Sequence, residues 1–173
     1  MKDPHIFTQS ARTKGYEPHL PLAARRINES MIEFVVSHVD DFVELSRKNP
    51  VSAKLFLMGM AFKGIPETSD IRFSTSVDIL RQLQKRYPRI AIYDPIAQRS
   101  DLETLGAVVV SAPEKGFQEA DAVLVLTNHP SFTDLDIFAL AATMNRPGLL
   151  FDPWGAYTEE QLSELEGIAY AGL

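Results

Sequence analysis

The stretch KLFLMGMAFKGIPETSDIRFSTS, residues 54–76, decides the fold of this chain. After Lys54, residues 55–60 are apolar on both faces, as in a strand that is buried inside a parallel sheet. A loop follows, and Ser74, Thr75 and Ser76 are natural N-caps for an amphipathic helix that begins near Val77. This order of strand, loop and helix predicts one βα unit of a parallel α/β sheet.

The rest of the chain repeats this order. Short apolar runs, each expected to be a strand, occupy residues 54–60, 90–93, 107–110, 122–126, 149–151 and 168–170. Helical or polar segments lie between them at residues 75–87, 100–105, 113–120, 135–144 and 159–165. We therefore expect a doubly wound, mainly parallel, Rossmann-like α/β sheet over residues 51–173. The strand order is not readable from the sequence.

A long helical segment precedes the sheet. Over residues 19–46 apolar side chains recur every three or four positions, and Asn49-Pro50 is expected to end the helix. Its apolar face is wide. Three explanations of this wide apolar face are open: the helix packs along a second domain, it forms an interface with a partner subunit, or it covers the chain's own sheet. We predict a homodimer built along residues 19–46.

Composition narrows the classes of function. The 173 residues carry a net charge of -6, which argues against a nucleic-acid partner or an anionic membrane, since both require a broad basic surface. The chain has no cysteine, which excludes disulfides, thiolate zinc sites and a thiol nucleophile within it, and fits a reducing cytoplasm. No apolar run approaches the roughly 20 residues of a membrane span. The four histidines have no ligand spacing, so we expect no metal site.

Two cations stand out because the chain is acidic. Lys63 and Arg72 lie in the loop after the first strand, at the sheet edge where parallel α/β proteins hold ligands. With the amino end of the next helix they suggest a site for an anion such as phosphate. The plain alternative is that Lys63 is a solvated loop lysine and that Arg72 pairs with Glu67 or Asp70.

Other strand ends offer further candidates. Asp94 follows the second strand and either holds ribose hydroxyls or forms a turn with Pro95, while the first turn, GMAFKG, lacks the G-x-G-x-x-G dinucleotide fingerprint. Thr127, Asn128 and His129 follow the fourth strand. They either line a pocket with the Lys63 loop or, for His129, cap the next segment. A basic cluster is interpreted as a solvated face: Arg81, Lys85, Arg86 and Arg89.

Several of these residues occur in a known order. The segment AFKGIPETSDIRFSTS resembles the opening of the C-terminal domain of the UDP-glucose/GDP-mannose dehydrogenase family, in particular of its UDP-N-acetylhexosamine 6-dehydrogenase branch. The matching residues are Phe62, Lys63, Asp70, Arg72 and Ser74. The likeness extends to KDPHIF, AARRINESM, YDP and ADAVLVLTNHPSF, at residues 2–7, 23–31, 93–95 and 120–132.

The resemblance implies a domain division and a ligand. Residues 1–50 would be the helical tail of the central, dimerisation domain, and residues 51–173 the UDP-sugar-binding domain. Phe62 and Lys63 match residues that contact the UDP-sugar, and Arg72 matches one that reaches NAD. Asp3 matches an aspartate with a general-base role toward the hydrolytic water.

The resemblance also implies an NAD-dependent oxidation of a sugar C6 alcohol to a carboxylate, through a cysteine thiohemiacetal and thioester. The domain that mainly binds NAD is not found in this sequence, and the cysteine would fall just before Met1. We therefore expect a fragment that is inactive alone. One departure concerns the ligand site, because FDPWGAY places Trp154 where the family has an arginine. Either the substrate differs, or another cation compensates, or Trp154 serves packing alone.

The sequence bears on two other classes of protein. A self-contained nucleotide-binding or regulatory module would use the same cleft without chemistry. A phosphoacceptor signalling domain needs acids at the end of the first strand, and Met58, Gly59 and Met60 supply none.

Overall fold

A computed structural model describes residues 3–162 and 165–172 of the chain. Within these residues six strands form one sheet in the order β3-β2-β1-β4-β5-β6, and every adjacent pair is parallel. The strands are β1 (Lys54–Met58), β2 (Arg89–Tyr93), β3 (Val108–Val109), β4 (Ala122–Val125), β5 (Gly148–Asp152) and β6 (Ile168–Gly172). The predicted fold class is confirmed, and the sheet is wholly rather than mainly parallel.

The sheet is apolar on both faces because each face has its own core. In β1, Leu55 and Leu57 belong to one core, and Phe56 and Met58 belong to the other. This division follows from the two-residue period of side chains along a strand. It explains why the strands are continuous apolar runs rather than alternating ones.

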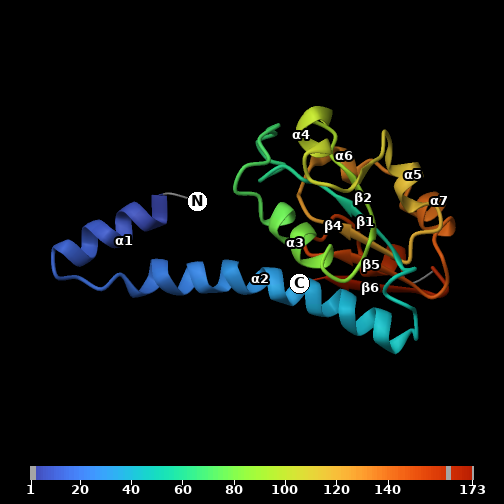
Figure 1. Cartoon of the computed structure of the whole chain (residues 1–173), viewed down its shortest axis with the longest axis horizontal. Helices are drawn as coiled ribbons and strands as arrows, with labels where there is room; N and C mark the ends of the chain where they lie inside the picture. The colour runs from blue at the N-terminus through green and yellow to red at the C-terminus, as the bar shows by residue number, and fades with distance from the viewer. Residues whose placement is uncertain (1–2, 163–164, 173) are drawn as a thin grey trace.

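Helices cover both faces (Figure 1). The first core lies under α2 (His19–Leu45) and α3 (Thr75–Leu83), and the second under α5 (Pro113–Phe117) and α7 (Ile137–Ala142). The other helices are α1 (Asp3–Thr13), α4 (Arg99–Glu103), α6 (Pro130–Thr133) and α8 (Glu159–Leu162). The periodicity of the sequence did not predict α1 or α6, although the family resemblance placed α1 within a helical tail. The remaining elements lie where the sequence places them, mostly with shorter bounds.

The two halves of α2 differ in environment. Val35, Val39 and Val43, one turn apart, are buried against the sheet and α3. The first half extends beyond the sheet, with α1 beside it (Figure 1), and leaves Leu20 and Ile27 81% and 63% exposed. The second half therefore covers the chain's own sheet, which was one of the three explanations. The homodimer along residues 19–46 stays a prediction.

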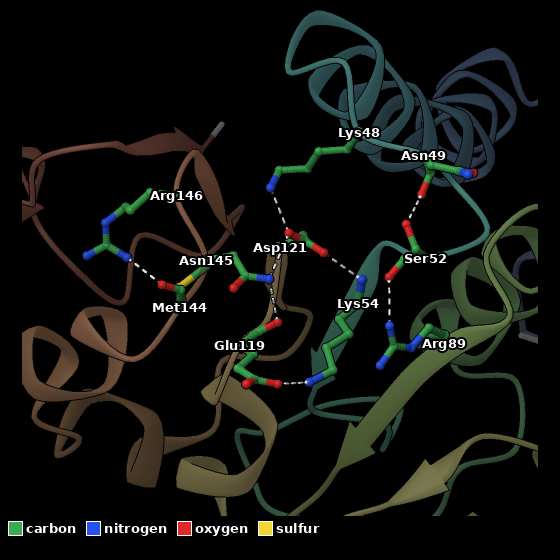
Figure 2. Close-up of polar contacts among 10 residues, drawn as sticks. All are labelled: Lys48, Asn49, Ser52, Lys54, Arg89, Glu119, Asp121, Met144, Asn145 and Arg146. Carbon is green, nitrogen blue, oxygen red and sulfur yellow. Dashed lines mark hydrogen bonds and ion pairs between the residues drawn. The ribbon is translucent and has the colours of Figure 1, made fainter.

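A polar network fixes the end of α2 at the amino edge of the sheet (Figure 2). The carboxylate of Asp121, before β4, accepts hydrogen bonds from Lys48 Nζ at 2.7 Å, from the Lys54 backbone N–H at 2.8 Å and from Asn145 Nδ2 at 3.0 Å. Burial disfavours ionisation of Asp121, but these hydrogen bonds outweigh it and lower its pKa. One acid thus joins α2, β1 and the start of β5.

The basic cluster at the end of α3 is an exposed face, as interpreted from the sequence. One member also bridges elements: Arg86 pairs with Asp40 of α2, and Tyr87 Oη donates to the same carboxylate at 2.6 Å. No helix among the described residues is both long and apolar enough to cross a membrane.

Candidate functional site

The carboxyl end of β1 is held by the acid that ends β2. Asp94 Oδ2 accepts hydrogen bonds from the N–H groups of Met60 at 2.7 Å and Ala61 at 2.8 Å. Its Oδ1 accepts from the N–H groups of Ile96 at 2.9 Å and Ala97 at 2.8 Å. The carboxylate is buried, so both oxygens serve the fold. The turn-forming interpretation of Asp94 is confirmed, and the ribose-binding one is not supported.

Phe62 and Lys63 follow directly and project from this anchored backbone. The Phe62 side chain is 48% exposed, and Lys63 Nζ lies 5.2 Å from the centre of its ring, within the range of a cation–π contact. Among the described residues, no carboxylate lies within ion-pair distance of Lys63 Nζ. An ammonium group without a counter-charge, at the carboxyl edge of a parallel sheet, is suited to an anionic ligand.

Arg72 is paired within the same loop. Its Nε and Nη2 donate to the two oxygens of Asp70 at 2.9 and 2.7 Å, and its backbone N–H also donates to Oδ1. The Arg72 side chain is 80% exposed. The side-chain hydrogen bond from Arg72 lowers the pKa of Asp70 from 3.8 to about 2. The alternative in which Arg72 pairs with an acid of its own loop is confirmed, with Asp70 as that acid.

Two of the three hydroxyl groups at the start of α3, those of Ser74 and Ser76, are used by the protein itself. Ser74 caps the helix, because its Oγ accepts from the Ser76 N–H at 3.2 Å, and it also donates to the Ala61 carbonyl at 3.3 Å. Ser76 Oγ donates to the carbonyl of Leu126 at 3.4 Å. Both serine side chains are buried. They fix α3 and the loop to the sheet and are not exposed to a ligand.

The residues after β4 contact the Lys63 loop directly, and the pocket that they were expected to line with it stays a prediction. Asn128 Oδ1 accepts from the Gly64 N–H at 3.1 Å, and His129 Nε2 lies 3.3 Å from Glu67 Oε1. The other interpretation is confirmed, because His129 Nδ1 accepts from the Ser131 N–H and caps α6. The contact with Glu67 was missed, since nothing in the spacing of residues 64–70 signals where that side chain points.

The loop after β5 brings an indole to the same edge. Asp152 is fully buried and accepts from the N–H groups of Trp154 at 3.2 Å and Tyr157 at 3.1 Å. Burial raises the pKa of Tyr157, whose Oη donates to the carbonyl of Phe132 at 2.7 Å. This framework leaves Trp154 53% exposed, so its indole is not packed in the core.

Asp3 lies away from these residues along the chain. It opens α1, which contacts α2 and lies apart from the sheet in Figure 1. Its side chain falls outside the part of the chain whose side chains the structure describes. The catalytic role of Asp3 therefore stays a prediction.

Comparison with known proteins identifies the family of this chain. Residues 56–159, which include the Lys63 loop and the ends of β2, β4 and β5, match the UDP-glucose/GDP-mannose dehydrogenase family, UDP binding domain. The chain belongs to this family.

Relatives within the family act on more than one sugar. The chain is 30% identical over 134 residues to UDP-N-acetyl-D-glucosamine 6-dehydrogenase of Pseudomonas aeruginosa, covering 77% of this chain and 31% of that protein. It is 30% identical over 122 residues to UDP-glucose 6-dehydrogenase of Rhizobium meliloti, covering 70% of this chain and 27% of that protein. The chain thus spans about a third of the length of these relatives.

A solved structure shows the same fold. The UDP-D-ManNAc dehydrogenase of Pyrococcus horikoshii superposes on 99% of this chain and 36% of its own, with a TM-score of 0.79 at 24% identity. The likeness includes the region of α1 and α2, which lies outside the residues matched to the UDP binding domain.

The carboxyl edge of the sheet lacks the open glycine turn that binds the pyrophosphate of a dinucleotide. Gly59 has a φ of +87°, and a Cβ there would lie 2.1 Å from Thr127 Oγ1, so the space beside this glycine is filled by protein. In G-x-G-x-x-G sites the glycines instead let a pyrophosphate approach the backbone. With both oxygens of Asp94 also engaged, the described residues of this edge do not fit NAD as its main binding site. The contact of Arg72 with NAD stays a prediction.

Proposed function

We propose that this chain binds a UDP-sugar at the carboxyl edge of its sheet, as the nucleotide-sugar-binding part of an NAD-dependent 6-dehydrogenase. The observation that carries the proposal is Lys63. Its ammonium group has no carboxylate partner among the described residues, and it lies within the segment matched to the UDP binding domain. The names of the relatives, which include two UDP-sugar dehydrogenases, support the same ligand class.

Each predicted residue has a role in this proposal. Lys63 binds a phosphate oxygen of the diphosphate, and the exposed ring of Phe62 lies against the ligand. The guanidinium group of Arg72 keeps its two hydrogen bonds to Asp70 and directs its remaining N–H groups toward NAD. The NAD itself is held mainly by a domain other than this one. Asp3 holds a proton from the hydrolytic water. NAD, when bound, accepts the hydride.

The chemistry requires more than the 173 residues. Since the chain contains no cysteine, it forms neither thiohemiacetal nor thioester, and we expect it to bind UDP-sugar without oxidising it. A homodimer through residues 19–46 and a cytoplasmic location belong to this proposal. The absence of a thiol equally favours the second candidate, a binding or regulatory module that uses the same edge without chemistry. The two candidates are separated by whether activity appears when a polypeptide that carries the cysteine and the NAD-binding domain is supplied.

Isothermal titration of the chain with UDP tests the proposal. Lys63→Ala is expected to weaken UDP binding about tenfold or more, because a hydrogen bond to a charged group contributes roughly 1.5–3 kcal/mol. Lys85→Ala is the matched control: Lys85 follows α3, bonds only to Gln82 among the interactions described for it, and lies at the opposite edge of the sheet. Binding that is absent at millimolar UDP, or equal in Lys63→Ala and the unaltered chain, would contradict the proposal.

A further inference from the structure

Gly64 and the end of β4 are in unusually close contact. A Cβ at Gly64 would lie 2.4 Å from the backbone nitrogen of His129, and its N–H donates to Asn128 Oδ1 at 3.1 Å. Only a residue without a side chain permits this approach. The backbone one residue after Lys63 is therefore fixed against β4.

His129 makes the second contact with this loop. Its ring is 7% exposed, and Nδ1 accepts from the Ser131 N–H at 3.2 Å, so the hydrogen-bond pattern assigns the proton of the neutral ring to Nε2. Nε2 is buried and has no aligned hydrogen bond among the described residues. The carboxylate oxygen Glu67 Oε1, later in the same loop, lies 3.3 Å from Nε2. The buried N–H thus faces one loop carboxylate.

The other side of the loop is fixed independently. Asp94 binds the N–H groups of Met60 and Ala61, and the Phe62 N–H donates to the carbonyl of Asp70 at 3.0 Å. Lys63 consequently lies between a residue held by β2, Ala61, and a residue held by β4, Gly64. Holding a binding side chain before the ligand arrives removes part of the ordering cost of binding.

We infer that Asn128 and His129 are positioning residues for ligand binding, which act by holding the Lys63 loop through Gly64 and Glu67. This inference rests on the proposed function and names the residues that prepare the same site. Neither side chain needs to touch the ligand. Asn128 sets the backbone after Lys63, and His129 sets the arm of the loop that carries Glu67.

Two matched pairs of variants isolate the contacts. Asn128→Ala removes the acceptor for Gly64, and Asn49→Ala removes the same kind of bond, from the Val51 N–H at 3.0 Å, at the amino edge of the sheet. Glu67→Ala and Glu67→Gln remove the same negative charge, but glutamine keeps an oxygen for His129 Nε2. Simple electrostatics predicts that both Glu67 variants bind an anion more tightly, whereas positioning predicts that only the alanine variant binds more weakly.

The readouts are UDP titration and amide hydrogen exchange of residues 59–72. We expect Asn128→Ala and Glu67→Ala to weaken UDP binding about fivefold to tenfold, and Glu67→Gln and Asn49→Ala to stay within about twofold of the unaltered chain. Exchange of residues 62–67 should accelerate in Asn128→Ala and Glu67→Ala only. Unchanged UDP affinity in Asn128→Ala, or equal affinities in the two Glu67 variants, overturns the inference.

If the proposed function is wrong, the UDP titration gives a different result from the one expected if only the positioning role is wrong. If the unaltered chain shows no UDP binding, the proposed ligand is wrong, and hydrogen exchange alone decides the positioning role. Faster exchange of residues 62–67 in Asn128→Ala than in Asn49→Ala then supports it, and equal exchange overturns it.

Discussion

Replacing Asp121 with alanine tests whether the network at the amino edge holds the sheet and α2 together. The Asp121 side chain is 9% exposed and accepts three hydrogen bonds, from Lys48, from the Lys54 backbone and from Asn145. Alanine leaves all three donors without this partner. Removing one member of a buried ion pair costs about 3–5 kcal/mol of unfolding free energy. Because the Lys48 side chain is 17% exposed and regains some water, we expect a loss near the lower limit, about 3 kcal/mol.

Urea unfolding followed by far-ultraviolet circular dichroism measures this loss. Glu119→Gln is the control, since Glu119 pairs with Lys54 in the same region but its side chain is 67% exposed, and its loss should be far smaller. The lowered pKa of Asp121 adds a dependence on pH. Its stabilising contribution is present above the ordinary aspartate pKa and is lost as the pH falls through the lower folded-state value. A loss in Asp121→Ala no larger than that in Glu119→Gln would refute the reasoning.

Two further predictions concern the carboxyl edge. Gly59→Ala should destabilise the chain by about 3 kcal/mol or more, since it combines a strained positive φ with a Cβ only 2.1 Å from Thr127 Oγ1. Gly155→Ala, with a φ of +62° and open space around it, measures the backbone strain alone, so equal losses in urea unfolding would contradict the packing argument. The carboxylate of Asp70 should titrate at a pKa of about 2 by NMR, and Arg72→Ala should raise this pKa toward 3.8. A midpoint that does not move would show that Arg72 is not the cause.

The sheet was predictable because its strands are apolar on both faces, as in β4, where all four residues are buried. That pattern needs only the chain's local composition. The position of Lys63 and Arg72 at the carboxyl edge followed from the same pattern, since the loop after a parallel strand leaves at that edge. By contrast α1 has few apolar residues, and two of them, Ile6 and Phe7, are exposed. Nothing in such a segment distinguishes a helix from a loop.

The hydrogen bonds and ion pairs within the site were less predictable from the sequence. The sequence left Asp94 between a ligand role and a turn, because the choice depends on how closely the end of β1 passes it. The pairing of Glu67 with His129 depends on the path of residues 64–70, which have no periodicity. For Arg72 the sequence offered two acids, and only the geometry of the loop selects Asp70.

The unequal halves of α2 have a mechanical consequence. Its second half packs on the sheet through Val35, Val39 and Val43, and Ile32 and Phe34 also pack against that core, while residues 19–31 extend for about 20 Å at 1.5 Å per residue. Because α2 is fixed to the sheet at one end, a tilt of its other end is transmitted to the sheet. A partner that bound the exposed Leu20 and Ile27 would therefore set the orientation of the sheet, and with it the direction in which Lys63 faces.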